Sequence, residues 1–213
     1  AGFLRLFSVF SYLKDDFVPI FWGMAVATML FGNITAIFQK DLKRLLAYSS
    51  ISHMGYVMLA FVSYGCESQF GKNSSLQIEA GTSGIFYLFA YTAMNMGLFG
   101  VISMFSRYEK DFSTIEDFQG MGYKKPWQAF ILSLSLLSLA GIPPTAGFMG
   151  KFYLFNVALK AGFINLVIIA VISNAISIYY YLRLIVVMYM KEDKEFTEEV
   201  SFSGAENLAM LIV

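Results

Sequence analysis

The chain has 213 residues, of which 57% are hydrophobic and 14% charged, and its formal net charge at pH 7 is zero. This composition lies outside the range of soluble domains and indicates a membrane protein with several spans. A neutral chain gives no indication of a nucleic acid partner. The single cysteine, Cys66, excludes an internal disulfide and any zinc or iron–sulfur site built from thiolates of this chain.

Long uncharged apolar stretches alternate with polar connectors along the chain. A bilayer has a hydrocarbon core of about 30 Å, which about 20 helical residues can cross. We therefore expect one all-α domain, a polytopic membrane helix bundle. Its five complete spans are predicted at residues 17–38, 45–64, 82–105, 127–159 and 163–190, with partial spans at 1–13 and 207–213.

The two ends of the chain lie within apolar stretches. The first residue is Ala1 rather than methionine, and the segments before Lys14 and after Glu206 are too short to be complete spans. We therefore expect the chain to be an interior fragment of a longer protein. A functional residue that is missing from this sequence is then no evidence that the function is missing.

Basic residues are distributed unequally between alternate connectors. The connectors after the first, third and fifth segments carry three basic residues, whereas the other connectors carry nine. Membrane proteins keep basic connectors on the cytoplasmic side. We therefore predict that the second set faces the cytoplasm, or the mitochondrial matrix if the source is an organelle.

The apolar stretch 127–159 is too long to be one straight span. Its 33 residues would extend about 50 Å as a helix, against about 30 Å of hydrocarbon. Pro143 and Pro144 lack a backbone N–H, and Gly141 and Gly147 are weak helix formers. We expect a broken helix near Gly141–Pro144. The alternative is a proline kink with a lysine that reaches the membrane surface.

Lys151 is the single charge in this stretch, and at least seven apolar or small residues flank it on each side. A charge at membrane depth is costly and typically marks an ion or proton pathway. All fifteen acidic residues lie in connectors or at span ends, so none is placed to pair with Lys151 at mid-membrane. A lysine without a permanent partner can exchange its proton with hydrated neighbours. We predict that Lys151 transfers protons.

His53 and Lys43 are the other candidates for proton transfer. His53 is the only histidine and follows Lys43 by ten residues, about 15 Å along a helix and near the bilayer midplane. Histidine titrates near neutral pH, so a relay role and a structural histidine bonded to a hydroxyl both stay open. Lys43 also fits the orientation rule without any further function.

Arg183 and the run Tyr179–Tyr181 lie near the end of the last complete span. We interpret Arg183 as reaching the lipid headgroups or a partner chain, and the tyrosines as an interfacial aromatic belt. The sequence has no glycine-rich phosphate loop, no metal-ligand cluster and no set of residues for a catalytic triad. Redox chemistry is therefore not expected on this chain.

Two long motifs resemble the antiporter-like subunits of respiratory complex I, the NADH-quinone oxidoreductase. They are DLKRLLAYSSISHMGY at 41–56 and GIPPTAGFMGKFY at 141–153. The resemblance extends over essentially the whole chain. It is strongest to the subunit N group, the counterpart of mitochondrial NADH dehydrogenase subunit 2, because the related subunit M commonly has a glutamate where this chain has Lys151.

The resemblance implies an antiporter-like inverted-repeat fold of fourteen helices with one broken helix in each repeat. This chain would run from the end of the eighth helix to the start of the fourteenth. His53 would lie in the tenth helix and Lys151 in the broken twelfth, on a central polar axis. The family's other key residues, a glutamate in the fifth helix and lysines in the seventh and eighth, would precede Ala1.

The function that the resemblance implies is proton translocation coupled to quinone reduction elsewhere in the complex. This chain would be an enzyme subunit that binds no cofactor, with quinone, FMN and iron–sulfur clusters in other subunits. Its partners would be the other membrane-arm subunits and the lipid bilayer, in the bacterial inner membrane or alternatively the mitochondrial one. A subunit of a multi-subunit sodium/proton antiporter and a non-transporting membrane scaffold are the alternatives.

Overall fold

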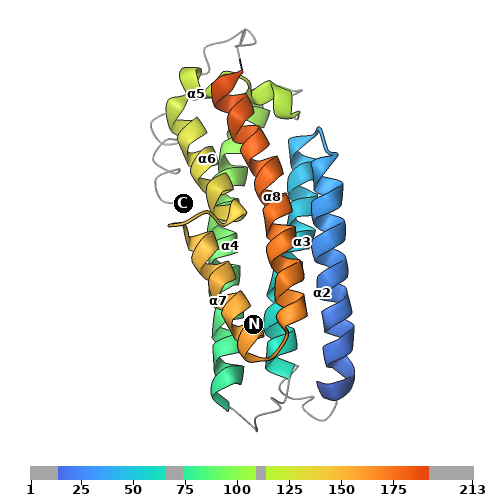
Figure 1. Ribbon diagram of the computed structural model, residues 1–213. Helices are drawn as coiled ribbons and strands as arrows, with labels where there is room; N and C mark the ends of the chain where they lie inside the picture. The colour runs from blue at the N-terminus through green and yellow to red at the C-terminus, as the bar shows by residue number, and fades with distance from the viewer. Residues whose placement is uncertain (1–13, 66–73, 109–113, 192–213) are drawn as a thin grey trace.

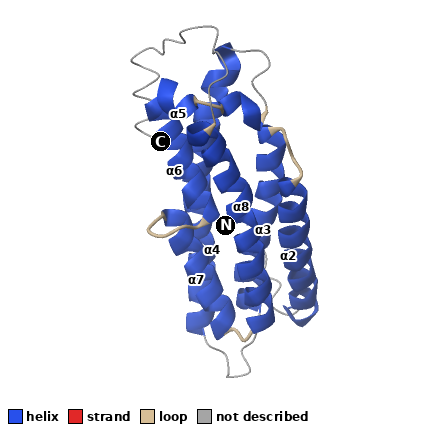
Figure 2. Ribbon diagram, turned by 45° about the horizontal axis from the view of Figure 1, so that its top comes forward, coloured by secondary structure: helices blue, strands red, loops and turns tan. Residues whose placement is uncertain are grey.

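The computed structural model of the protein describes residues 14–65, 74–108 and 114–191 (Figure 1). These residues form helices and no strands, which confirms the predicted all-α class (Figure 2). The predicted partial spans at 1–13 and 207–213 lie outside the described residues. The helices are α2 (Lys14–Ile37), α3 (Leu42–Gly65), α4 (Ser74–Tyr108), η2 (Ile115–Phe118), α5 (Met121–Lys124), α6 (Pro126–Ala140), α7 (Ala146–Lys160) and α8 (Ile164–Met190).

Four of these helices are long and apolar enough to cross a membrane. The apolar segments are Phe17–Ile37, Leu42–Gly65, Ser75–Phe105 and Ile164–Met190. Helix α4 begins eight residues before the expected span at 82–105. In its first turns Glu79 forms a 2.6 Å ion pair with Lys160 at the end of α7. Leu76 and Ala80 of the same turns pack with Val157 of α7. The residues added before the predicted span therefore pack against α7.

The long helices run up and down the bundle, with α8 between the α2–α3 pair and the α4–α6–α7 group (Figure 1). At one end, the backbone N–H of Ile115 donates to the carbonyl of Lys40 at 3.0 Å, so the connectors after α2 and α4 lie together. At the other end lies the Glu79–Lys160 pair. Connectors that alternate along the chain therefore lie at opposite ends of the bundle. The predicted membrane orientation assumes this arrangement.

Two large apolar clusters fill most of the described interior, one toward each end of the bundle, and a small third cluster joins the start of α4 to α7. The first joins the end of α2 and parts of α3, α4, α6 and α8 with the short helices η2 and α5. The second joins α2, α3, α4, α7 and α8. Where the two large clusters meet, the helices contribute polar side chains and four tyrosines that also belong to the clusters. We call this set the polar layer: Asn33, Ser49, Ser52, His53, Tyr56, Tyr87, Lys151, Ser173, Asn174, Ser177, Tyr180 and Tyr181.

The predicted break near Gly141–Pro144 is confirmed, because α6 ends at Ala140 and α7 begins at Ala146. Gly141 has φ 77°, a left-handed conformation that closes the end of α6. The peptide bond Pro143–Pro144 is cis. Thr145 starts α7 as its N-cap, where its side chain accepts a hydrogen bond from the N–H of Phe148.

Gly147 lets the two half-helices overlap at the break. Its N–H donates to the Ser138 side chain at 3.1 Å. A Cβ atom at this position would collide with the backbone carbonyl of Ser138. The close approach of α6 and α7 therefore requires a residue without a side chain.

The substitution Gly147→Ala should destabilise the protein by about 1–3 kcal/mol, because backbone atoms must move to admit the new methyl group. A matched control is Gly100→Ala in α4, where a Cβ would meet nothing within 4 Å. Thermal unfolding of the detergent-solubilised full-length protein measures both variants. A Gly147→Ala midpoint equal to or above that of Gly100→Ala would contradict the close packing.

Candidate functional site

Lys151 lies inside the bundle, with 3% of its surface exposed. Its Nζ donates to the Leu139 carbonyl at 2.7 Å and to Asn174 Oδ1 at 2.5 Å. The Tyr56 ring lies 5.0 Å from Nζ, measured to the ring centroid. Both hydrogen-bond acceptors are neutral, so in the part of the chain that the structure describes the ammonium is held by dipoles and a ring face rather than by a carboxylate.

The helix break supplies one of these acceptors. In an uninterrupted helix the Leu139 carbonyl would accept from the N–H of residue 143, four positions later. That residue is Pro143, which has no N–H, so the carbonyl is available to Lys151. Gly141 adds space, since a Cβ there would lie 3.2 Å from Lys151 Cδ and 3.4 Å from Nζ. The break therefore both binds the amine and makes room for it.

His53 is also buried, with 1% of its surface exposed. Both ring nitrogens are hydrogen-bonded, Nδ1 to the Tyr87 hydroxyl at 2.6 Å and Nε2 to the Tyr181 hydroxyl at 3.0 Å. The Tyr181 hydroxyl also bonds the Ser49 side chain. A neutral imidazole has one donor and one acceptor nitrogen, so one tyrosine donates to His53 and the other accepts from it.

The structure brings His53 and Lys151 together around Tyr56. The Tyr56 ring is close to both, 5.8 Å from the His53 ring by centroids and 5.0 Å from Lys151 Nζ. The buried Tyr56 hydroxyl faces Ser173 and Asn33 without a well-formed hydrogen bond to either.

Helix α8 joins the two groups by a second route. Asn174, which contacts Lys151, and Tyr181, which contacts His53, are seven residues apart with Ser177 between them. Residues at spacings of three and four lie on one face of a helix. The Ser177 hydroxyl donates to the Asn174 carbonyl at 2.7 Å. One face of α8 therefore carries polar groups from the lysine to the histidine.

A further set of hydrogen bonds joins α2 to α8 within the polar layer. Tyr180 donates to Asn33 Oδ1 at 2.8 Å, and Asn33 Nδ2 donates to the Ser173 hydroxyl at 2.6 Å. Ser173 in turn donates to the Met29 carbonyl at 3.0 Å. These buried polar groups are satisfied by one another, as buried groups must be if the bundle is to be stable.

The interpretation of Tyr179–Tyr181 as an aromatic belt is wrong for two of the three residues. Tyr179 is 61% exposed, but Tyr180 and Tyr181 are buried and hydrogen-bonded. Consecutive residues on a helix point about 100° apart, so the three rings cannot all face outward. The sequence carries a signal for this face: Ser173, Asn174, Ser177 and Tyr181 recur at helical spacing.

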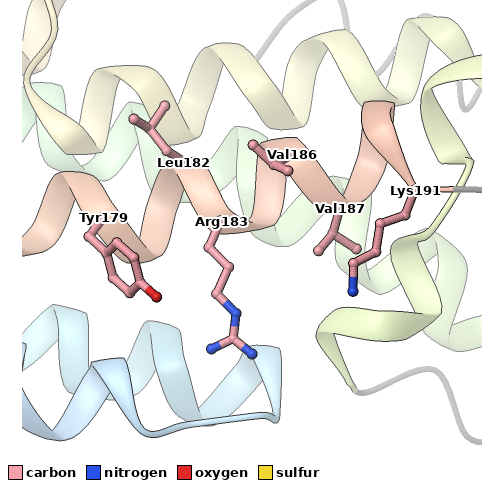
Figure 3. Close-up of a pocket in the computed structure, with 6 residues that line it drawn as sticks. All are labelled: Tyr179, Leu182, Arg183, Val186, Val187 and Lys191. Carbon is pink, nitrogen blue, oxygen red and sulfur yellow. The ribbon is translucent and has the colours of Figure 1, made fainter.

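Arg183 and Lys43 lie outside the polar layer. Arg183 is exposed and, with Lys191, Tyr179 and three aliphatic residues, lines a surface hollow of about 400 Å³ (Figure 3). Its contact with headgroups or a partner chain stays a prediction. Lys43 is exposed in the first turn of α3. Ten residues separate it from His53, about 15 Å along the helix, so the structure does not bring it to the buried cluster.

Taken together, the apolar helices, the break and the two buried ionisable side chains define a polytopic membrane protein that holds protonatable groups inside its helix bundle. The family model described as "NADH:quinone oxidoreductase/Mrp antiporter, TM" matches residues 1–177. The chain belongs to this family. It is part of a multi-pass inner-membrane protein.

Relatives of known name match most or all of the chain. It is 42% identical over 214 residues to NADH-quinone oxidoreductase subunit N of Trichlorobacter lovleyi, covering 100% of this chain and 41% of the relative. It is 44% identical over 194 residues to subunit N of Bdellovibrio bacteriovorus, covering 90% and 38%. The chain thus spans about two fifths of the length of these relatives. The predicted similarity to subunit N is confirmed.

Solved structures with the same fold come from two kinds of complex. One is respiratory complex I from Thermus thermophilus with bound NADH, with a TM-score of 0.77, 25% identity and coverage of 93% of this chain and 39% of that one. The other is the Mrp complex from Dietzia sp., with a TM-score of 0.68, 26% identity and coverage of 85% and 32%. The predicted antiporter-like fold is confirmed by these likenesses.

The substitution Tyr87→Phe should destabilise the protein by about 1–3 kcal/mol, because it leaves a buried nitrogen of His53 without a partner. Tyr179→Phe removes a hydroxyl from an exposed ring and serves as the control. Chemical denaturation of the full-length protein in detergent reports the difference. Equal stability of the two variants would argue against the His53–Tyr87 hydrogen bond.

Proposed function

We propose that the chain forms part of a proton-translocating membrane-arm subunit of an NADH-quinone oxidoreductase. Protons would move through the polar layer, driven by quinone reduction elsewhere in the complex. The observation that carries this proposal is Lys151: a buried amine held by two neutral oxygens, one of them freed by the helix break. The relatives named as subunit N support it.

Lys151 would receive and release the proton. As an ammonium it donates to the Leu139 carbonyl and to Asn174 Oδ1. As a neutral amine it retains donors for those bonds and gains a lone pair that can accept the next proton. Because neither acceptor carries a charge, the proton is not held by an ion pair, which would oppose its release.

His53 would relay the proton through its two nitrogens. A proton arriving on one nitrogen allows the other to release its own, after which the ring is neutral with the opposite tautomer. Tyr87 and Tyr181 already lie at hydrogen-bond distance from these nitrogens. Each hydroxyl can reverse its donor role by rotation, so the tyrosines extend the relay on both sides of the imidazole.

Lys43 would exchange protons with the aqueous phase at the basic end of the bundle. It is exposed in the first turn of α3, on the same helix as His53. In this proposal the path from Lys43 to the polar layer follows α3 and includes residues from the remainder of the protein. Neutral replacement of Lys43 tests this role separately from that of Lys151.

The partners in this proposal are other membrane-arm subunits and the lipid bilayer. Quinone, FMN and iron–sulfur clusters would belong to other subunits, and this chain would carry no redox step. Its contribution to the enzyme would be to hold and move protons at Lys151 and His53. A bacterial cell is the proposed source of the membrane, since the relatives named as subunit N are bacterial.

A sodium/proton antiporter subunit is the second candidate function, favoured by the family model and by the likeness to the Mrp complex. The two functions differ in their driving force. In sealed vesicles, the proposed enzyme subunit moves protons when NADH is oxidised and without any sodium gradient. Proton movement that instead follows an imposed sodium gradient and ignores NADH would identify the antiporter. A non-transporting scaffold would support neither movement through this chain.

Replacing Lys151 by alanine should abolish or strongly reduce proton pumping while the complex still assembles, because the polar layer loses its proton-carrying amine. Lys160→Ala is the matched control, since Lys160 lies on the same helix but pairs with Glu79 at the surface. A pH-sensitive dye in sealed vesicles, read against NADH oxidation, gives the protons moved per electron pair. Parental pumping by the Lys151 variant would remove Lys151 from the mechanism.

A further inference from the structure

We infer that Asn174 is a positioning residue for Lys151, and that the neutrality of its amide is what leaves the lysine's proton exchangeable. The inference rests on the proposed function. It concerns a residue on α8 that neither the sequence motifs nor the comparisons single out.

The side-chain amide of Asn174 points toward the Lys151 amine. Asn174 Oδ1 lies 2.5 Å from Lys151 Nζ, and a Cβ built on Gly141 would lie 3.7 Å from Asn174 Nδ2. The ammonium has only donors, so the amide must present its oxygen to it. The Ser177 hydroxyl lies 3.4 Å from the same oxygen, on the next turn of α8. Asn174 on α8 and the Leu139 carbonyl at the end of α6 therefore both bind the Lys151 amine.

The other polar and titratable groups around Lys151 come from the helices that form the polar layer. Helix α6 contributes the Leu139 carbonyl, and α3 contributes Tyr56 and His53. Helix α4 contributes Tyr87, whose ring packs against the position of Gly150. Elsewhere in the polar layer, Tyr181 of α8 bonds His53, and Tyr180 of α8 donates to the neutral Asn33 of α2. No carboxylate of the described residues is among them, so Asn174 is the side-chain acceptor that distinguishes ammonium from amine.

An amide and a carboxylate differ in how strongly they make that distinction. A hydrogen bond between two charged groups is about twice as strong as a neutral one, and the low dielectric of a buried site increases the difference. A carboxylate in place of Asn174 would lock the proton on Lys151. An aliphatic residue would leave Leu139 as the single acceptor and disfavour the ammonium. The amide stabilises the ammonium less than a carboxylate and more than an aliphatic residue. A lysine that must bind and release a proton in each cycle requires such an intermediate acceptor.

Three isosteric or similar variants test this inference in the assembled complex in sealed vesicles. Asn174→Leu removes the acceptor, Asn174→Asp makes it an anion, and Asn174→Gln keeps the amide. Asn156→Asp makes the same amide-to-acid change on α7, at a half-buried position away from the polar layer. The measurement is protons moved per NADH oxidised across a range of pH values. Lys151→Ala is measured beside them.

We expect Asn174→Leu and Asn174→Asp to lower pumping at neutral pH at least threefold. Their pH profiles should move in opposite directions, each by about one pH unit, which corresponds to a change of about 1.4 kcal/mol between the two protonation states. Asn174→Gln should keep more than half of the parental pumping, and Asn156→Asp should match the parent. A merely structural role for Asn174 would not separate the two profiles.

The outcomes that overturn the inference are distinct from those that overturn the proposed function. Normal pumping by Lys151→Ala defeats both. Two outcomes defeat only the role of Asn174, provided that Lys151→Ala loses pumping. In the first, Asn174→Leu and Asn174→Asp both keep the parental pH profile of pumping. In the second, the pH profiles of these two variants move in the same direction. If the aspartate variant does not assemble, the pair Asn174→Leu and Asn174→Gln decides: equal loss in both overturns the inference, and loss confined to leucine supports it.

Discussion

The hydrogen bond from Lys151 to the Leu139 carbonyl links the break in the chain to the chemistry of the site. An amine inside an apolar bundle needs acceptors, since a buried charge without them is strongly unfavourable. The carbonyls of a regular helix already accept one hydrogen bond within the helix, so a carbonyl without that bond is a stronger acceptor for the amine. Pro143 removes one N–H and so releases one carbonyl. Gly141 and Gly147 then allow the half-helices and the lysine side chain to approach it.

The polar layer extends this arrangement across the bundle. Apolar clusters above and below it supply the packing that holds the helices together, so the layer can consist of groups chosen for hydrogen bonding. Within it each described ionisable group meets neutral partners: Lys151 an amide and a carbonyl, His53 two phenols. Such partners stabilise a group without committing it to one protonation state. That property is what proton movement through this family's fold would require.

Sequence reasoning reached the helical class, the break and the burial of Lys151 and His53, because each follows from local features: long apolar runs, two prolines and a charge among apolar residues. Helix α4 begins eight residues before the span predicted at 82–105, and its first turns contact α7 through the Glu79–Lys160 pair. The prediction assigned Tyr180 and Tyr181 to the membrane surface and overlooked Tyr87 and Asn174. For these four residues the missing information was the direction in which a helix face points.

The amino-acid order alone therefore established that a lysine and a histidine lie in apolar spans beside an interrupted helix. It could not establish what they touch. The partners of His53 lie 34 and 128 residues away, and Asn174 lies 23 residues from Lys151 on a different helix. Such contacts depend on how each helix is rotated and how deeply it packs against its neighbours. Those quantities come from the burial of whole helix faces, which no single stretch of sequence contains.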